Sequence, residues 1–332
     1  MNLSDKFKNS DNIAVVRTDR IGDMVLTLPL IRALKEYQPR FNVSVIAASY
    51  TEELLKNDYT DNYFFVDKHE GGINGIFREN NFDAVFFPMP KFNESAAGYL
   101  AKIPIRIGTA FRAYSFFFNH RIHDHRKISE YHEAEYNLRM AESICGMKFT
   151  LKAVQPSSEP ELLLKMKTLT NELKECNSNK LIVFHPSSRA SSKDLPVSTL
   201  INTIKALSSI SNIKICITGS KDDSELCKHI ESSCKGIINL CGRFDLAEMI
   251  AFIKNIDLLL ANSTGILHIA SVCEIPVIGF YPNTAHISAK RWGPIGKNKT
   301  IITPDNTVNS MKDDMSDIKV ETIIRAISSF IG

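Results

Sequence analysis

The sequence predicts an α/β protein with parallel sheets, and two observations carry that prediction. Short apolar runs alternate with amphipathic helical patterns along the whole 332-residue chain, as parallel strands and their crossover helices do. The length also exceeds the roughly 100–200 residues of a usual single domain. We therefore expect two domains of similar size, each with its own core.

The first half reads as strands and helices in alternation. The expected strands are Ile13–Arg17, Val43–Ala47, Tyr63–Val66, Ala84–Pro88 and Arg106–Gly108. Helices are expected to start near Asp23, Thr51, Ile73 and Glu94. Tyr131–Cys145 has apolar residues at helical spacing, so a helix there should close the first domain.

The segment Val154–Pro160 combines two prolines with polar residues and is the expected linker. The predicted domains are therefore residues 1–155 and 160–332. The strands expected in the second are Leu181–His185, Lys214–Thr218, Ile237–Leu240, Leu258–Ala261 and Val277–Phe280. Its helices should start near Pro196, Lys221, Leu246 and Thr264. The last helix, Val320–Phe330, is amphipathic and could pack on either domain, including back on the first.

Composition limits the function classes. A 44% hydrophobic and 23% charged chain with a formal charge of +3 is typical of a soluble globular protein, and its scattered Lys and Arg lack a nucleic-acid footprint. The polar start gives no signal peptide, and no apolar run approaches the roughly 20 residues of a membrane span. Seven cysteines without a C-x-x-C pair favour a reducing cytoplasm, with Cys216 and Cys273 in the core.

The first segment suited to chemistry runs from Arg17 to Pro29. Ligands of open α/β sheets bind beyond the carboxyl ends of the strands. Gly22 would let a ligand approach there, and Asp23 would follow at the first turn of a helix. Asp23 is therefore a candidate catalytic carboxylate. The alternative is a helix N-terminal acid stabilised by the helix dipole by about 0.3–1 kcal/mol.

The loop after the first strand of the second domain offers hydroxyls and cations. Ser187 and Ser188 could donate to a phosphate, and Arg189 and Lys193 could neutralise it. A solvated, serine-rich turn is the alternative. Further on, Glu225 could hold ribose hydroxyls or belong to an ordinary helix start.

The segment Asn262–Ala270 predicts a capped helix start after a strand. Ser263 or Thr264 can cap the helix that begins near Gly265, and its first N–H groups can face an anion. His268 lies on a mostly apolar helix face, where a hydrogen-bonded structural histidine is the favoured interpretation.

Basic and aromatic residues gather in the second part of the first domain. They are Arg106, Phe111, Arg112, Phe116–Phe118, Arg121, Arg126 and Lys127. They could meet an anionic, lipid-linked acceptor at a membrane interface. A solvated basic loop over an aromatic core cluster is the equal alternative.

These motifs together resemble the ADP-heptose:lipopolysaccharide heptosyltransferases, glycosyltransferase family nine. The resemblance is carried by Arg17, Ile21–Asp23, Pro29, Asn262–Ala270, Pro276–Val277 and Trp292–Pro294. It implies the GT-B fold, two Rossmann-like doubly wound domains facing across a cleft. It also implies that the first domain binds the acceptor and the second the nucleotide sugar.

The resemblance assigns roles to individual residues. Asp23 would be the general base of an inverting transfer. Lys193 would offset charge on the leaving diphosphate, and Glu225 would lie near the donor ribose. The other expected donor-site residues are Gly22, Ser187, Ser188, Arg189, Asn262, Ser263, Thr264, Gly265 and His268. Ser263 departs from the family, because many members have Asp there.

The expected function is transfer of heptose from ADP-heptose to a lipopolysaccharide core or other surface glycan, without metal or cofactor. The expected location is the cytoplasm, with peripheral contact at the cytoplasmic face of the inner membrane. Three alternatives stay open: a different donor sugar, a nucleotide-sugar-binding protein without catalysis, and an NAD-dependent oxidoreductase. No G-x-G-x-x-G follows an expected strand, which disfavours the last.

Overall fold

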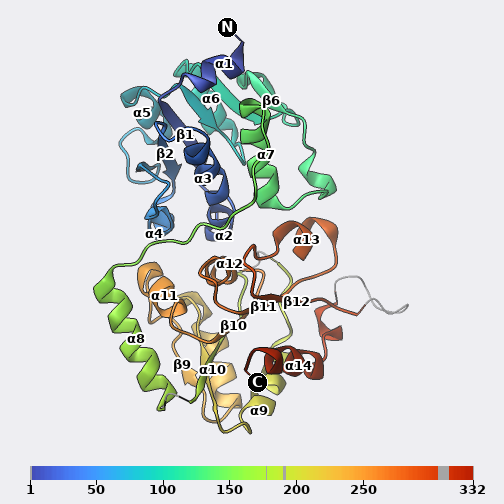
Figure 1. Cartoon of the computed structure of the whole chain (residues 1–332). Helices are drawn as coiled ribbons and strands as arrows, with labels where there is room; N and C mark the ends of the chain where they lie inside the picture. The colour runs from blue at the N-terminus through green and yellow to red at the C-terminus, as the bar shows by residue number, and fades with distance from the viewer. Residues whose placement is uncertain (1, 177, 190–191, 306–313, 332) are drawn as a thin grey trace. The chain divides into compact units, whose positions relative to one another are not determined.

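The chain forms two compact units, Met1–Ser157 and Ser158–Gly332 (Figure 1). The computed structural model describes residues 2–176, 178–189, 192–305 and 314–331. The division falls inside the proline-containing segment Val154–Pro160 that the sequence marks as a linker. Each unit has its own sheet and helices and is described by itself.

The first unit is built on a six-stranded parallel sheet in the order β3-β2-β1-β4-β5-β6. The strands are β1 (Asn12–Arg17), β2 (Asn42–Ala47), β3 (Asn62–Phe65), β4 (Ala84–Phe86), β5 (Ile105–Thr109) and β6 (His120–Ile122). This is the order of the Rossmann fold, in which chain direction across the sheet reverses between β1 and β4. The carboxyl ends of these two strands are therefore the expected ligand position.

Helices cover both faces of this sheet. They are α1 (Leu3–Lys8), α2 (Ile21–Val25), α3 (Leu28–Tyr37), α4 (Glu52–Leu55), α5 (Gly72–Glu79), α6 (Phe92–Leu100) and α7 (Glu133–Cys145), with short 3-10 turns η1 (Ser49–Thr51), η2 (Ser115–Phe117) and η3 (Arg126–Ile128). Ala14 and Val16 face a core shared with α5 and α6. Helix α7 packs against α1 and α3.

The second unit repeats this topology with the order β12-β11-β10-β7-β8-β9. Its strands are β7 (Lys180–His185), β8 (Ile213–Ile217), β9 (Ile238–Asn239), β10 (Leu258–Asn262), β11 (Val277–Phe280) and β12 (Lys299–Ile302). Counted from β7, the order is again that of the Rossmann fold. The reversal lies between β7 and β10, so a second ligand position is expected at their carboxyl ends.

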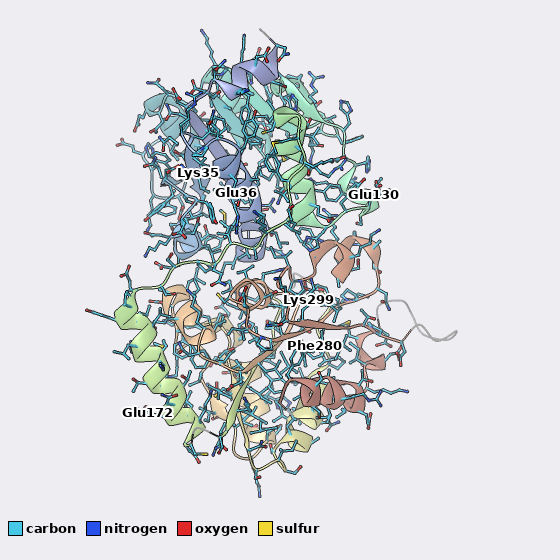
Figure 2. All side chains as sticks on the ribbon, in the orientation of Figure 1. Lys35, Glu36, Glu130, Glu172, Phe280 and Lys299 are labelled. Atoms are coloured by element: carbon cyan, nitrogen blue, oxygen red, sulfur yellow. The ribbon has the colours of Figure 1, made fainter. Side chains whose placement is uncertain are left out.

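The helices of the second unit also form two layers. They are α8 (Pro160–Lys174), α9 (Val197–Leu207), α10 (Ser224–Ser233), α11 (Leu246–Ile253), α12 (Gly265–Val272), α13 (Ala289–Trp292) and α14 (Val320–Ile331), with η4 (Lys221–Asp223), η5 (Ala285–Ile287) and η6 (Met315–Asp317). Phe280 points into the core, whereas Glu172 projects from α8 (Figure 2). Helix α14 packs on α9, and its Ile323 and Ile327 join the same core as Phe280.

The structure confirms the predicted fold class and all ten expected strands, with ends shifted by a few residues. It adds a sixth strand to each sheet, β6 and β12. Helices α1 and α8 were not expected from the sequence. Cys216 and Cys273 are buried as expected. Within the described residues, every helix is too short or too polar to cross a bilayer.

Candidate active site

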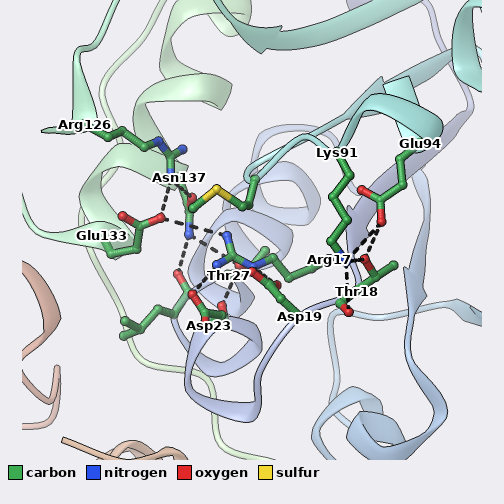
Figure 3. Close-up of polar contacts among 12 residues, drawn as sticks. Arg17, Thr18, Asp19, Asp23, Thr27, Lys91, Glu94, Arg126, Glu133 and Asn137 are labelled. Carbon is green, nitrogen blue, oxygen red and sulfur yellow. Dashed lines mark hydrogen bonds and ion pairs between the residues drawn. The ribbon is translucent and has the colours of Figure 1, made fainter. Parts of the chain in front are cut away.

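Arg17 is the last residue of β1, and its guanidinium is completely buried where β1 borders β4. Its Nε lies 2.6 Å from Asp19 Oδ1, and its Nη2 donates to Asp23 Oδ1. A buried cation needs such partners, because removing a charge from water is costly. Arg17 therefore organises the loop and helix that follow β1 (Figure 3).

Asp23 lies in the first turn of α2, where its side chain is 15% exposed. The pKa of Asp23 is raised from 3.8 to about 6, mainly by burial and also by the nearby carboxylates of Asp19 and Glu133. Arg17 acts in the opposite direction and lowers it. A carboxylate with a pKa near 6 can accept a proton at neutral pH far better than an ordinary aspartate.

Glu133, the first residue of α7, is completely buried beside the same cation. Its Oε1 lies 3.9 Å from Arg17 Nη1 and accepts from Arg126. One turn later, Asn137 Nδ2 donates to the carbonyl of Leu26, just after α2, at 3.0 Å. Helix α7 thus contacts both Arg17, the cation that pairs with Asp23, and the end of α2, the helix that carries Asp23.

A second polar group lies at the same end of β1. Thr18 donates to the buried carboxylate of Glu94 at the start of α6, and Lys91 Nζ donates to Thr18 Oγ1 at 2.6 Å. Lys91 Nζ is also 3.6 Å from Glu94. These contacts fix the loop between β4 and α6 against the end of β1.

A small pocket lies at the carboxyl ends of β4, β5 and β6. Its lining residues are Phe87, Pro88, Thr109, Ile122, Asp124, Arg126, Tyr136 and Met140. Arg126 contributes to both the pocket and the ion-pair network around Arg17. The pocket therefore adjoins the polar network that contains Asp23.

In the second unit, the buried side chain of Asn262 holds both ends of the loop that follows β7. Its Nδ2 donates to the carbonyl of Pro186 at 2.5 Å, and its Oδ1 accepts from the amide of Leu195 at 2.9 Å. Asn262 ends β10, which neighbours β7. The loop is thereby placed at the point of the sheet where a ligand is expected.

The loop residues expected at a phosphate differ in their exposure. Ser188 is buried, and its amide donates to Asp194 at 3.2 Å. Arg189 has a positive φ of 50° and an exposed side chain that pairs with Asp222. Ser187 hydrogen-bonds to Asp223, and Lys193 is exposed. Ser191, which the sequence places in the same loop, lies outside the described residues.

Helix α12 starts at the carboxyl end of β10, as the sequence predicts. Thr264 is its N-cap, with Oγ1 accepting from the amide of Leu267 at 3.2 Å, and Gly265 is the first helical residue. His268 is 4% exposed. Ser263 hydrogen-bonds to the buried Tyr281.

Most of the predicted donor residues lie at the carboxyl ends of neighbouring strands of the second sheet. The loop that follows β7 is contacted at Pro186 and Leu195 by Asn262, the last residue of β10. Glu225 lies in the first turn of α10 with its side chain 91% exposed, just after Asp222 and Asp223, which contact Arg189 and Ser187 of that loop. Gly22 and Asp23 belong to the first unit. Around the described residues, no three His, Cys, Asp or Glu side chains are grouped closely enough to hold a metal ion.

Sequence reasoning missed Glu133 and the hydroxyl of Thr18. Glu133 is 110 positions from Asp23 along the chain. The sequence around it indicates only a capping box at a helix start. Its role depends on α7 packing beside α3, which no local pattern encodes.

Comparison with known proteins decides the family. The profile of glycosyltransferase family 9 (heptosyltransferase) matches residues 76–319. The chain belongs to glycosyltransferase family 9. The matched range starts after Asp23. A catalytic role for Asp23 in this family 9 chain therefore depends on the geometry of the first unit and on the sequence motif.

Similar proteins cover most or nearly all of the family 9 chain. The lipopolysaccharide core heptosyltransferase OpsX of Haemophilus influenzae is 25% identical, over 81% of this chain and 78% of its own. A family 9 glycosyl transferase of Veillonella parvula superposes with a TM-score of 0.85 at 18% identity, over 97% of both chains. E. coli ADP-heptose lps heptosyltransferase II gives 0.78 at 17% identity, over 96% and 98%. The predicted GT-B fold class is confirmed.

Asn262→Ala should loosen the loop between β7 and α9. The substitution leaves the buried amide of Leu195 without its acceptor, which costs about 1–3 kcal/mol. Hydrogen exchange at the Leu195 amide should become much faster than in the wild type. Asn298→Ala, which removes an exposed side-chain bond to Glu274, is the control. Unchanged exchange at Leu195 would mean that Asn262 does not hold the loop.

Proposed function

We propose that this family 9 chain is an inverting heptosyltransferase that moves heptose from ADP-heptose to a lipopolysaccharide core or another surface-glycan acceptor. It would act at the cytoplasmic face of the inner membrane. Family membership and the names of its relatives support the donor and the acceptor class. The observation that carries the catalytic assignment is the partly exposed carboxylate of Asp23, beside a buried arginine at the carboxyl end of β1.

The proposed reaction is a single displacement. The acceptor hydroxyl oxygen attacks the anomeric carbon of heptose, and its proton passes to the carboxylate of Asp23. The bond from that carbon to the diphosphate oxygen breaks, and its electron pair leaves with ADP. Attack opposite the leaving group inverts the configuration. The pKa of about 6 at Asp23 suits this proton transfer at neutral pH.

The second unit would bind the donor. The described parts of the loop after β7, residues 186–189 and 192–195, and the amide end of α12 follow the carboxyl ends of adjacent strands. Exposed Lys193 would balance charge that grows on the leaving diphosphate. Transfer would then need no metal ion or cofactor, so activity should persist in excess EDTA. The first unit would bind the acceptor.

Asp23→Asn should lower turnover by roughly a hundred- to ten-thousand-fold, the usual effect of losing a general base. Binding of ADP should not change. Asp19→Asn, which removes another carboxylate partner of Arg17, is the comparison and should lower turnover far less than Asp23→Asn. ADP release with the true acceptor is the measurement. A wild-type rate for Asp23→Asn would remove Asp23 from the chemistry.

The pH dependence of kcat/KM should rise through a midpoint near 6, because only deprotonated Asp23 can accept the proton. Glu133→Gln should move this midpoint to lower pH. Removing the charge of Glu133 lowers the pKa of Asp23, while Arg17 stays in contact with it. Glu130→Gln, an exposed carboxylate just before α7, should leave the profile unchanged. A Glu133→Gln midpoint equal to the wild type would exclude this coupling.

Lys193→Ala should weaken ADP binding and slow single-turnover transfer, since the leaving diphosphate loses a counter-charge. Arg189→Ala should have a smaller effect, because the Arg189 side chain is exposed and already paired with Asp222. Titration of ADP and rapid-quench kinetics measure the two effects. If neither variant changes either quantity, this loop is not part of the donor site.

A thermal-shift panel tests the donor class. ADP-heptose should raise the melting temperature more than ADP, and UDP, GDP and NAD should have no effect. Ser263, which contacts Tyr281 where many family members have Asp, is the reason to include other ADP-sugars. A larger rise in melting temperature with another ADP-sugar would identify that sugar, not heptose, as the donor. A rise with NAD alone would contradict the proposed function.

A further inference from the structure

An exposed aromatic cluster surrounds Phe117 on the first unit. The ring centroid of Phe117 lies 5.7 Å from Phe92, 5.4 Å from Tyr99 and 4.4 Å from Phe116. Leu100 follows Tyr99 at the end of α6 and is 72% exposed. We call these five residues the α6–η2 patch. Four of them are more than one-third exposed, and only Phe117 is buried.

The patch differs from the aromatic segment that the sequence suggested. Phe118 is buried in the core with Phe87, and Phe117 is the centre of the cluster rather than its surface. Phe116, at 60% exposure, is the member of that run that faces solvent. The other exposed members come from both ends of α6, where Phe92 and Tyr99 are seven residues apart and share a helix face.

Polar contacts support the patch. Arg106 Nε donates to the carbonyl of Phe117 at 2.7 Å, and its guanidinium lies 5.4 Å from the centre of the Tyr99 ring. The hydroxyl of Tyr114 donates to the carbonyl of Pro90 at 2.8 Å. Exposed apolar side chains that gather in one place, rather than singly over the surface, mark an interaction site.

The chain segment that carries this apolar surface has an excess of positive charge. Residues 91–129 contain seven Lys or Arg and two Asp or Glu, although the whole chain has a formal charge of only +3. Both acids are already paired: Glu94 lies 3.6 Å from Lys91, and Asp124 lies 2.7 Å from Arg139. The exposed charges of the segment are therefore mainly positive. They include Lys102, Arg112, Arg121 and Lys127.

We infer that the α6–η2 patch docks the chain on the surface of an anionic phospholipid bilayer. Aromatic and leucine side chains enter the boundary between headgroups and acyl chains, while nearby Lys and Arg attract anionic headgroups. A second copy of the chain fits less well, because a symmetric contact would bring two basic surfaces together. The inference needs neither the donor nor the acceptor proposed above.

Flotation of the full chain with phosphatidylcholine vesicles, with and without phosphatidylglycerol, tests the docking surface. The wild type should float with the anionic vesicles, less so with neutral ones, and salt should weaken its binding. L100S/F116S should lower binding to anionic vesicles by about tenfold or more, and Lys102→Gln should lower it less. Leu164→Ser changes an equally exposed leucine on α8 and should bind as the wild type does.

Two further measurements separate lost docking from lost folding or lost donor binding. Circular dichroism melting and ADP titration should be the same for L100S/F116S and the wild type. The inference would be overturned if the wild type floated with neither kind of vesicle, or if the L100S/F116S variant floated like the wild type. A wild-type dimer in sedimentation that the double variant abolishes would also overturn it, because the patch would then join two copies.

Discussion

The buried guanidinium of Arg17 is the interaction on which the first unit's site depends. It has no access to water, so it requires negative partners, and Asp19, Asp23 and Glu133 come to it from the loop after β1, from α2 and from α7. Removing one member of such a buried group typically costs about 3–5 kcal/mol, because a charge is left uncompensated. The same requirement that folds this edge of the sheet therefore fixes the position of Asp23.

This arrangement also explains how a carboxylate beside an arginine keeps a raised pKa. Arg17 is shared among three carboxylates, and the second cation, Arg126, pairs with Glu133 rather than with Asp23. Arg17 therefore does not fully compensate Asp23, and burial penalises its charged form. In the second unit, Asn262 holds a loop with neutral hydrogen bonds at the equivalent place between β7 and β10. In both Rossmann-like units the polar group lies where the chain direction across the sheet reverses. In the first unit it includes the titrating Asp23, and in the second it is the hydrogen-bonded amide of Asn262.

The sequence predicts the parts of this protein that local patterns encode. Apolar runs bounded by turns locate ten strands, and the strand ends locate Asp23, the loop after β7 and the Thr264 cap. The short β6 and the edge strand β12 carry too few apolar residues to stand out. Glu133 could not be found because its partner Arg17 is distant in the chain and meets it only after α7 packs. Glu225 matched a family position, and its role at the donor ribose stays a prediction, with its exposed side chain at the start of α10.

The central claim is that the shared, buried cation leaves Asp23 with a proton affinity suited to catalysis. Carbon-13 NMR of the side-chain carboxyl groups, followed from pH 4 to pH 8, measures this affinity without substrate. The missing resonance in Asp23→Asn assigns the signal. The account predicts a titration of Asp23 with a midpoint at a pKa of about 6. A midpoint at or below that of an exposed aspartate, roughly 3.9, would contradict it, because Arg17 would then determine the pKa of Asp23 alone.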